Sequence, residues 1–454
     1  MLAVVTPAEM REIDAQAPEP IDVLIGRAAW EVARSALAML GGAYGRRVVV
    51  IAGPGNNGED GRVAAQLLAR RGVRCLVVEP GTTLPLSGTD LVVDAAYGTG
   101  FRDGWPVPAV GSVPVLSVDI PSGVDGLTGA DRGSLAASTT VTFGAVKPGL
   151  LLHPGAARAG QVVVAPIGLD VGRSSMWWVT DCDLATIRPR ATDEHKWSRA
   201  VRVVAGSKGM EGAAALTTRA ALRAGAGMVV VGGEATDDAT PISDPRLPVE
   251  AVARPLGREW VDDVLSDLHR FHSLAIGPGL GTGEAVRRQV REVIARSPVP
   301  VVVDADAITA VAEHPDVLRD TRSPVVLTPH EGEYARLAGR PIGVSRASEV
   351  AETARSLGAI VLLKGPTTLV ADPGGEVRFV TSGSPRLATA GSGDVLSGVI
   401  AAVLDPARLV DSVAVAAHWH GLAASFGSPG LVAGDLPDLL TAARLHATRP
   451  STTS

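Results

Sequence analysis

Residues 46–61 read RRVVVIAGPGNNGEDG and set the architecture of the first part of the chain. The run Arg47–Ala52 is rich in valine, as a buried strand is, and a helix is expected to follow and to continue to about Arg70. Between them lies a G-x-G-x-x-G pattern. Glycines at such a turn let the backbone approach phosphate closely, and the helix N-terminus offers unpaired N–H groups. The stretch therefore predicts a Rossmann-like unit that binds a nucleotide.

The alternation of short β-branched runs with Ala-, Leu- and Arg-rich helical stretches extends along the chain and restarts after residue 198. Such alternation predicts parallel α/β sheets. Residues 166–197 are rich in glycine, proline and charge, and interrupt the pattern as a domain connection does. We expect two α/β domains. Residues 1–173 form a Rossmann-like three-layer α/β/α sandwich, residues 174–447 form the second domain, and 448–454 are a flexible tail.

The composition narrows the class of protein. The chain has 454 residues, which exceeds what one hydrophobic core usually serves. A net charge of −6 and the absence of a lysine- or arginine-rich run argue against a nucleic-acid or anionic membrane partner. Cys75 and Cys182 are too few for a disulfide framework, and no stretch of about 18 apolar residues predicts a membrane-spanning helix. We expect a cytoplasmic protein with neither a nucleic-acid nor a membrane partner.

Polar side chains in and after the glycine pattern indicate more than pyrophosphate binding. Asn56, Asn57 and Asp60 place amides and a carboxylate where a plain pyrophosphate loop has small, uncharged residues. Asp94 and Asp119 end predicted strands, and ligands of open α/β sheets gather at that edge. A single aspartate at a strand end more often caps the next turn. The three motifs in order favour a functional site.

These motifs, GNNGEDG, DAAYGTGF and VDIPSGVDG, together resemble the NAD(P)H-hydrate epimerases over nearly all of the first 170 residues. The resemblance implies that Asp119 is the acid/base group that moves a proton during epimerisation at C6 of the hydrated cofactor. It also implies a potassium ion held by Asn57, Asp94 and Ser122, whose oxygens suit a hard cation. Glu59 stands where the family usually has glycine. The residues that would contact the substrate are Asn56, Asn57, Gly58, Glu59, Asp60, Gly98, Thr99, Gly100, Phe101, Arg102, Asp103 and Gly104.

The second domain carries its most specific pattern at residues 388–398, ATAGSGDVLSG. Small residues at a helix start expose N–H groups that can hold phosphate charge, and Asp394 in the first turn can take a proton from a hydroxyl. Upstream, KGPTT at 364–368 brings a cation and two hydroxyls to a strand end, which fits a nucleotide phosphate. In TPHEGE, Glu333 can hold magnesium through water and His330 can hydrogen-bond a substrate.

In their order, GPGLG, DAD, TPHEGE, KGPTT and AGSGD resemble the ribokinase-like dehydratases that act on NAD(P)H hydrate, over about residues 176–445. Kinases of the same fold typically carry alanine where Ser392 stands, which favours the dehydratase. The resemblance implies Mg²⁺ and ADP as cofactors, and Asp394 as the catalytic group that activates the C6 hydroxyl. It implies that Ala213, Gly279 and His330 contact the hydrated cofactor. The nucleotide would be bound by Lys364, Gly365, Pro366, Thr367, Thr368, Gly391, Ser392 and Gly393.

The remaining polar candidates are interpreted mainly as structural. His418 and His420 are expected to pack or to lie at the surface of a helix, and Asp125 is expected to serve a turn. Asp304 and Asp306 either support magnesium or shape a strand end.

Together the two resemblances predict an enzyme that repairs hydrated NADH and NADPH. The first domain would interconvert the R and S hydrates, and the second would dehydrate the S form with ADP. The alternative is a ribokinase-like small-molecule kinase with a Rossmann-like accessory domain. A dehydrogenase and a cofactor sensor are further alternatives. The sequence does not decide whether ADP or ATP is preferred, or whether the hydrate of NADH or of NADPH is preferred. It also leaves open whether substrate passes between the domains and whether the chain forms a homo-oligomer.

Overall fold

The structure, a computed structural model, describes residues 1–100, 104–172, 174–233 and 246–447. The expected substrate contacts of Phe101, Arg102 and Asp103, and the expected flexible tail, lie outside the described residues. The chain divides into two compact units. An N-terminal unit holds Leu2–Met176, and a C-terminal unit holds Met1 and the chain from Trp177 onward.

The N-terminal unit is built on a parallel sheet with the strand order β3-β2-β4-β5-β6-β7. This order reverses at β2, as in a Rossmann-like sheet. Its strands are β2 (Arg47–Ala52), β3 (Arg74–Val78), β4 (Leu91–Ala95), β5 (Val115–Val118), β6 (Thr139–Phe143) and β7 (Gln161–Ala165); β1 is Leu2–Val4. Its helices are α1 (Pro7–Ala15), α2 (Ile21–Leu40), α3 (Asn56–Arg70) and α4 (Ala156–Ala159).

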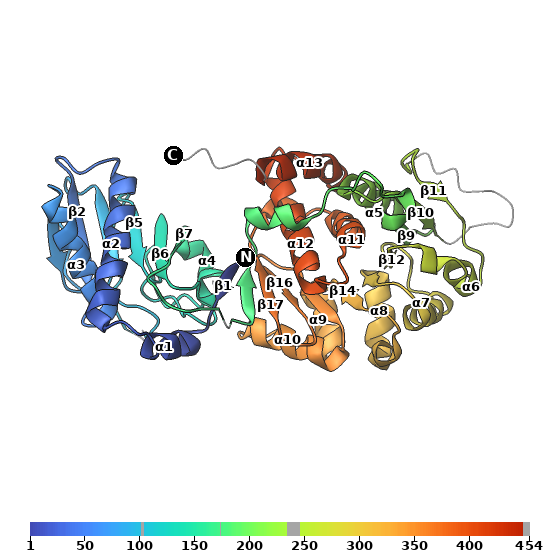
Figure 1. Cartoon of the computed structure of the whole chain (residues 1–454), viewed down its shortest axis with the longest axis horizontal. Coiled ribbons are helices and arrows are strands. Elements are labelled where there is room, and N and C mark those ends of the chain that lie inside the picture. The colour runs from blue at the N-terminus through green and yellow to red at the C-terminus, as the bar shows by residue number, and fades with distance from the viewer. Residues whose placement is uncertain (101–103, 173, 234–245, 448–454) are drawn as a thin grey trace. The chain divides into compact units, whose positions relative to one another are not determined.

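Helices α2 and α3 pack against one face of this sheet (Figure 1). Their small and aliphatic residues share a buried cluster with alternate side chains of β2, β4 and β5. The opposite face packs against the irregular segments that carry Trp105 and Leu135. Helix α3 begins at Asn56, so the Asn56–Gly61 stretch lies in its first turns, not in a preceding loop. A Cβ on Gly58 would lie 1.9 Å from the carbonyl oxygen of Gly53, so the turn requires glycine.

The C-terminal unit is built on a larger sheet, in which strand order runs β8-β17-β16-β15-β14-β13-β12-β9-β10-β11. The strands from β15 to β11 in this order are parallel, and β16 runs antiparallel to both β15 and β17. The strands are β8 (Met176–Trp178), β9 (Ala200–Val204), β10 (Met228–Gly232), β11 (Val252–Ala253), β12 (Ser273–Ile276), β13 (Val301–Val303), β14 (Val325–Leu327), β15 (Ile360–Leu363), β16 (Thr368–Ala371) and β17 (Val377–Val380).

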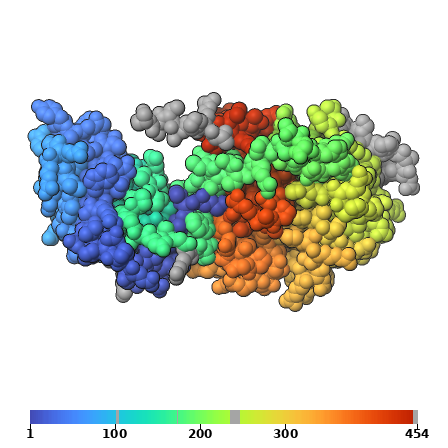
Figure 2. All heavy atoms as spheres, viewed as in Figure 1, coloured from blue at the N-terminus to red at the C-terminus, as the bar shows by residue number. Residues whose placement is uncertain are grey.

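Helices cover both faces of this sheet (Figure 1). On one face, α5, α11, α12 and α13 share a buried cluster with alternate residues of the strands. On the other face lie α6 to α10. The last helix, α13, lies at the surface of the unit (Figure 2). The helices are α5 (Glu211–Ala224), α6 (Val261–Leu265), α7 (Glu284–Arg296), α8 (Asp306–Glu313), α9 (Glu331–Ala338), α10 (Arg346–Leu357), α11 (Ser392–Val403), α12 (Leu409–Ser425) and α13 (Leu436–Ala447).

Two α/β units with mainly parallel sheets confirm the expected fold class. Within the described part of the chain, no helix combines the length and the apolar character needed to cross a membrane. Predicted functional residues follow the carboxyl ends of β2, β4, β5, β12, β14 and β15, the edge where open α/β sheets bind ligands. The AGSGD residues instead lie at the start of α11, after the antiparallel strand β17.

We predict that Gly398→Ala destabilises the C-terminal unit by about 2 kcal/mol or more, a cost typical of overpacking. The new Cβ would lie 2.2 Å from the carbonyl oxygen of Thr217 on α5, so the two helices must separate. Gly212→Ala is the matched control, because a Cβ there meets no atom within 4 Å. Calorimetric unfolding of both variants checks this, and an equal effect of the two would contradict it.

Candidate functional site

A cavity of about 580 Å³ lies at the carboxyl edge of the N-terminal sheet. Helices α1 and α2 supply part of its wall, the segments after β2, β4 and β5 supply another part, and Phe143, Lys147 and Ile167 complete it. The predicted residues that line it are Asn56, Asn57, Asp60, Gly98, Thr99, Gly100 and Asp119. Gly58 lies behind this wall against Gly53, Glu59 pairs with Arg62 at 3.4 Å, and Gly104 is not part of the lining. The three sequence motifs of this domain therefore meet at one cavity.

Asp119 follows β5 with a positive φ of 65°, which is unusual for a residue with a side chain. Its N–H donates to the carbonyl oxygen of Val141 at 2.7 Å. Its Oδ1 accepts from the ammonium of Lys147 at 2.5 Å and from the hydroxyl of Thr142 at 3.1 Å. Its Oδ2 lies beside Gly98, 3.7 Å from where a Cβ on that glycine would sit. One oxygen of Asp119 is therefore held by the protein, and the other lies toward the cavity.

Lys147 is not among the residues that the motifs predict. It is fully buried, with 1% of its surface exposed. A signal is present in the sequence, because only four of the 42 basic residues are lysines, and this one stands in the apolar run FGAVKPGL. A lysine in such a run must find an acidic partner, but the sequence alone does not show which one.

Asp60 adds a second carboxyl group to the cavity. Burial, together with the charges of Asp119, Glu59 and Asp14, raises its pKa to about 8. Among the described residues no side chain or backbone group donates a hydrogen bond to it, so no hydrogen bond offsets the cost of burying its charged form. Asp60 therefore holds a proton at neutral pH. Asp14 of α1 also lines the cavity, and burial raises its pKa too; no motif predicts it.

Asp94 and Ser122, two of the expected potassium ligands, are in direct contact. Ser122 donates to Asp94 from its hydroxyl at 2.6 Å and from its backbone N–H at 2.9 Å. Asp94 is fully buried, which raises its pKa. Asn57, the third expected ligand, differs, because both polar atoms of its buried side chain have no hydrogen-bond partner. Among the described residues no group of three His, Cys, Asp or Glu side chains forms a metal site.

In the C-terminal unit the predicted motifs meet around a buried ion pair. The ammonium of Lys364 lies 3.0 Å from Oδ1 of Asp304, and Ser397 donates to Oδ2 at 2.7 Å. Burial opposes the charge of Asp304, but Lys364 and Ser397 hold its pKa below the ordinary value. A Cβ on Gly393 would lie 3.5 Å from Nζ of Lys364. KGPTT, DAD and AGSGD are thereby brought to one place.

Asp394 lies in the first turn of α11, where the helix N-terminus favours negative charge. Burial and the charges of Asp304 and Asp306 raise its pKa to about 6. The helix is preceded by Gly391 with a φ of 91°. The hydroxyl of Ser392 donates to the carbonyl oxygen of Leu387 at 2.7 Å, so it ties the start of the helix to the preceding segment.

His330 caps α9, as its place before the helix indicates. Its Nδ1 accepts from the N–H groups of Gly332 at 3.0 Å and Glu333 at 3.3 Å. The carboxylate of Glu333 accepts from the N–H of His330 at 2.9 Å, which completes a capping box. Burial raises the pKa of Glu333. Nδ1 of His330 is thus used by the fold, and Nε2 lies 3.5 Å from Oε1 of Glu333 on a side chain that is otherwise largely exposed.

The other predicted residues lie at the same edge. A Cβ on Gly279 would lie 2.9 Å from the Cβ of Ala213, so these two predicted substrate contacts adjoin. Gly365, Pro366 and Thr367 connect β15 to β16, and Thr368 begins β16.

His420 on α12 is buried and interacts with the backbone of Ser392. Burial lowers its pKa to about 4, so it is neutral at pH 7. Its hydrogen bond to the backbone of Ser392 supports the glycine-rich turn. His418, also buried, pairs with Asp181 at 2.8 Å. Asp125 serves a turn, because it accepts from the N–H groups of Leu127 at 3.0 Å and Thr128 at 2.8 Å.

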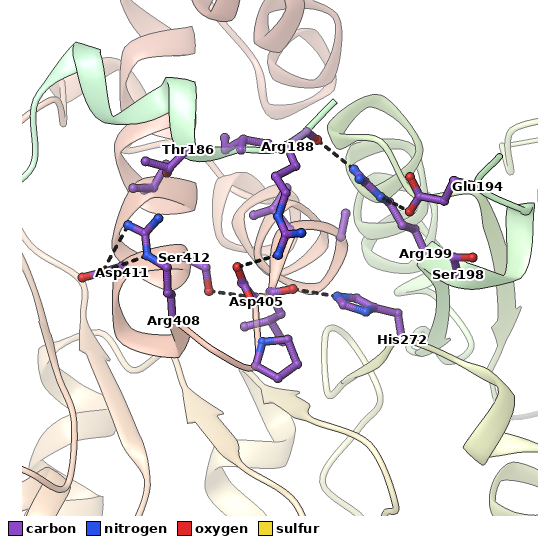
Figure 3. Close-up of a pocket in the computed structure, with 16 residues that line it drawn as sticks. Thr186, Arg188, Glu194, Ser198, Arg199, His272, Asp405, Arg408, Asp411 and Ser412 are labelled. Atoms are coloured by element: carbon purple, nitrogen blue, oxygen red, sulfur yellow. Dashed lines mark hydrogen bonds and ion pairs between the residues drawn. The ribbon is translucent and has the colours of Figure 1, made fainter. Parts of the chain in front are cut away.

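A second cavity, of about 240 Å³, lies at the other end of α11 (Figure 3). It contains none of the predicted site residues. Its charged groups pair with one another, Arg199 with Glu194 at 2.6 Å and Arg188 with Asp405 at 3.5 Å. This cavity carries none of the chemistry described above.

The fold and the two strand-edge clusters define a two-domain α/β enzyme. Residues 201–442 match the family described as NAD(P)H-hydrate dehydratase. Residues 21–87 and 79–149 match the family described as YjeF-related protein N-terminus. The bifunctional NAD(P)H-hydrate repair enzyme Nnr of Mycobacterium tuberculosis is 38% identical, over 85% of this chain and 85% of the relative. The enzyme of the same name from Moorella thermoacetica is 36% identical, over 96% and 95%.

The chain therefore belongs to the family of bifunctional NAD(P)H-hydrate repair enzymes, as the sequence motifs predict. A solved ADP/ATP-dependent NAD(P)H-hydrate dehydratase from Bacillus subtilis, co-crystallised with ATP and Mg²⁺, is 30% identical with a TM-score of 0.51; the match covers 60% of this chain and 98% of that chain. A ribokinase-like protein from Enterococcus faecalis, 23% identical with a TM-score of 0.52 over 61% and 98%, shows the same fold. The expected ribokinase-like fold of the second domain is confirmed.

We predict that Asp60→Asn stabilises the chain at high pH. The folded state retains the proton of Asp60 as its pKa rises from 3.8 to about 8, so the free energy of unfolding of the wild type falls as pH rises between these values. At pH 9 the free energy of unfolding of the variant should exceed that of the wild type by about 2 kcal/mol or more, and at pH 3.5 the two free energies should agree. Denaturant unfolding across this range measures the difference. Glu79→Gln, at an exposed residue of the same unit whose charge does not act on Asp60, is the control; a less stable Asp60→Asn at pH 9 would refute the assignment.

Proposed function

We propose that this chain repairs hydrated NADH and NADPH. The N-terminal unit interconverts the R and S hydrates, and the C-terminal unit dehydrates the S form in an ADP-dependent reaction. The observation that carries the proposal is that one chain of this family retains an acid-lined cavity in one unit and a Lys–Asp cluster beside a glycine-rich helix start in the other. Each activity supports the other, because a dehydratase specific for one epimer leaves the other unrepaired.

In the N-terminal unit, Asp119 is the acid/base group. The C6–O bond of the hydrate breaks when its oxygen gains a proton and the ring nitrogen supplies electrons. Water then returns to C6 from the opposite face and gives up one proton. A carboxyl group beside the substrate can first give and then take that proton. Asp60, protonated in the same cavity, keeps the total negative charge there low.

A potassium ion fits beside Asn57 in this unit. Buried polar atoms without a partner are costly, and both polar atoms of the Asn57 side chain are in that state. A cation would satisfy the amide oxygen and would balance nearby negative charge. Asn57, Asp94 and Ser122 would hold it with oxygen ligands. Its role would be electrostatic, to favour a substrate that carries phosphates.

In the C-terminal unit, Asp394 accepts the proton of the C6 hydroxyl as that oxygen takes the terminal phosphoryl group of ADP; the bond from that phosphorus to the bridging oxygen breaks, and AMP leaves. The ring nitrogen then expels phosphate, C5 loses a proton, and the C5–C6 double bond re-forms. The N–H groups at the start of α11, with Gly391, Ser392 and Gly393, face the developing phosphate charge. Lys364 to Thr368 bind the nucleotide, and positioning supplies most of the rate.

Magnesium would be held mainly by the nucleotide phosphates and water, with Glu333 through a water molecule. This matches the described residues, which form no group of three candidate ligands. Ala213, Gly279 and Nε2 of His330 would contact the hydrated dinucleotide.

We predict that Asp394→Asn abolishes ADP-dependent recovery of NADH from a mixed hydrate preparation, with a loss of at least about 10²-fold. Asp119→Asn should still convert the S hydrate in the mixture to NADH at the wild-type rate and should leave the R hydrate unconverted. Recovery of the reduced-nicotinamide absorbance with ADP and Mg²⁺ measures both. Each variant is the folding control for the other, because each retains one activity. A folded wild type without ADP-dependent recovery would overturn the proposed function.

The dehydration rate should depend on the ionisation of Asp394. This carboxyl group accepts a proton only when it is charged, and its pKa lies at about 6. We expect kcat/KM for the S hydrate to be constant above pH 7 and to fall about tenfold for each pH unit well below pH 6. Initial rates between pH 5 and pH 8 test this. A profile that stays flat down to pH 5 would exclude Asp394 as the base.

A further inference from the structure

Lys147 is held entirely by the protein. It follows β6, and its ammonium donates to Oδ1 of Asp119 at 2.5 Å, to the hydroxyl of Thr142 at 2.9 Å and to the carbonyl oxygen of Phe143 at 3.2 Å. An ammonium group has three N–H donors, and all three are used here. Lys147 therefore has no donor left for a substrate. Whatever it contributes to the reaction passes through Asp119.

The contact fixes which oxygen of Asp119 faces the cavity. Oδ1 is held by Lys147 and Thr142, and Oδ2 lies beside Gly98. The backbone of Asp119 is also constrained by its positive φ of 65°. With both the backbone and one oxygen fixed, the carboxylate has a single orientation toward the cavity, the preorganisation that proton transfer requires.

The charge of Lys147 matters as much as its geometry. Three carboxyl groups line this cavity, Asp14 from α1, Asp60 from α3 and Asp119 after β5. Arg11 of α1 lines it too, but Lys147 is the cation in contact with Asp119. A buried carboxylate without a paired cation is strongly disfavoured. Lys147 therefore places a compensating positive charge against Asp119, in a cavity that two other acids also line.

The chain uses a lysine where it otherwise prefers arginine; four of its 42 basic residues are lysines. The three acceptors of Lys147 surround one nitrogen atom. A compact ammonium matches that arrangement, and a planar guanidinium, with its donors spread along a fork, does not.

We propose that Lys147 is a positioning residue of the epimerase site, which orients Asp119 through Oδ1 and leaves Oδ2 to move the proton. This inference rests on the proposed epimerase function of the N-terminal unit. It assigns to Lys147 a role in turnover and none in substrate binding.

The test uses full-length chain and compares Lys147→Met, Lys147→Arg and the exposed Lys196→Met with wild type. Epimerisation of the R hydrate is followed by coupling to the chain's own dehydratase activity in excess ADP, with added Asp119→Asn protein to keep dehydration from limiting the rate. We expect kcat of Lys147→Met to fall about 10²-fold with KM within about threefold, as for loss of a positioned acid/base group. Lys147→Arg should recover little of this loss. Lys196→Met should keep the wild-type kcat and KM.

The pH profile separates positioning from folding. Lys147→Met removes the ammonium that contacts Oδ1 of Asp119, so the pH dependence of kcat for the R hydrate should differ from that of wild type. A purely structural role would lower the rate by the same factor at every pH, and that outcome would overturn the inference. Dehydration of the S hydrate by the same variant should equal wild type, which shows that the chain is folded and active.

Thr142→Val provides a milder second variant if Lys147→Met loses the N-terminal fold. It removes the hydroxyl that contacts both Lys147 and Asp119, and keeps a β-branched side chain in β6. We expect a severalfold fall in kcat and a change of the pH profile of the same kind as in Lys147→Met; an unchanged profile would overturn the inference. If the wild type epimerises the R hydrate and both variants match it, only the proposed role of Lys147 is refuted. If the wild type does not epimerise the R hydrate, the proposed function itself is refuted.

Discussion

A buried ion pair between a lysine ammonium and a strand-end aspartate supports each of the two sites. Lys147 pairs with Asp119 in the N-terminal unit, and Lys364 pairs with Asp304 in the C-terminal unit. Parallel strands bring several carboxyl groups to the same edge of a sheet, and like charges at short range oppose one another. One cation in each unit, Lys147 fully buried and Lys364 half-buried, reduces that repulsion, so the acids can remain together. Removal of either lysine would leave its aspartate without a paired cation in a largely desolvated place, which is strongly disfavoured.

Backbone strain accompanies this pairing in both units. Among the described residues other than glycine, positive φ occurs at Asp119 and Ala305. Asp119 is itself the paired acid, and Ala305 follows the paired Asp304. Such conformations persist where the surrounding structure fixes them, and they gather at functional sites. In the C-terminal unit close helix contact adds to the constraint, because Gly398 of α11 packs against the backbone of α5. The start of α11 is thereby held where Asp394 must lie.

The sequence predicts the parts of this structure that depend on local patterns. Valine-rich runs and glycine spacing locate the strands and the helix starts, and the order of motifs locates Asp119 and Asp394. It does not predict partners that come from distant segments. Asp14 reaches the first cavity from α1, and Lys147 reaches Asp119 from the end of the next strand. Both contacts follow from tertiary packing, which no spacing in one sequence reveals. His330 shows the opposite limit, because the chemistry of its side chain indicates a ligand contact and the structure uses one nitrogen as a helix cap.

The two sites are tuned in different ways, and the difference follows from what surrounds each acid. In the N-terminal cavity Asp60 accepts no hydrogen bond from the described residues and lies within reach of the charge of Asp119, so burial and repulsion keep its proton on at neutral pH. At the start of α11, Asp394 is half-buried beside acids, but Lys364 and the helix N-terminus favour its charged form, and its pKa remains at about 6. An epimerisation must return every proton that it moves, so a site that retains a proton suits it. A dehydration that begins with loss of a hydroxyl proton needs a base already charged at pH 7. The placement of one cation relative to each acid therefore separates the two chemistries within a single chain.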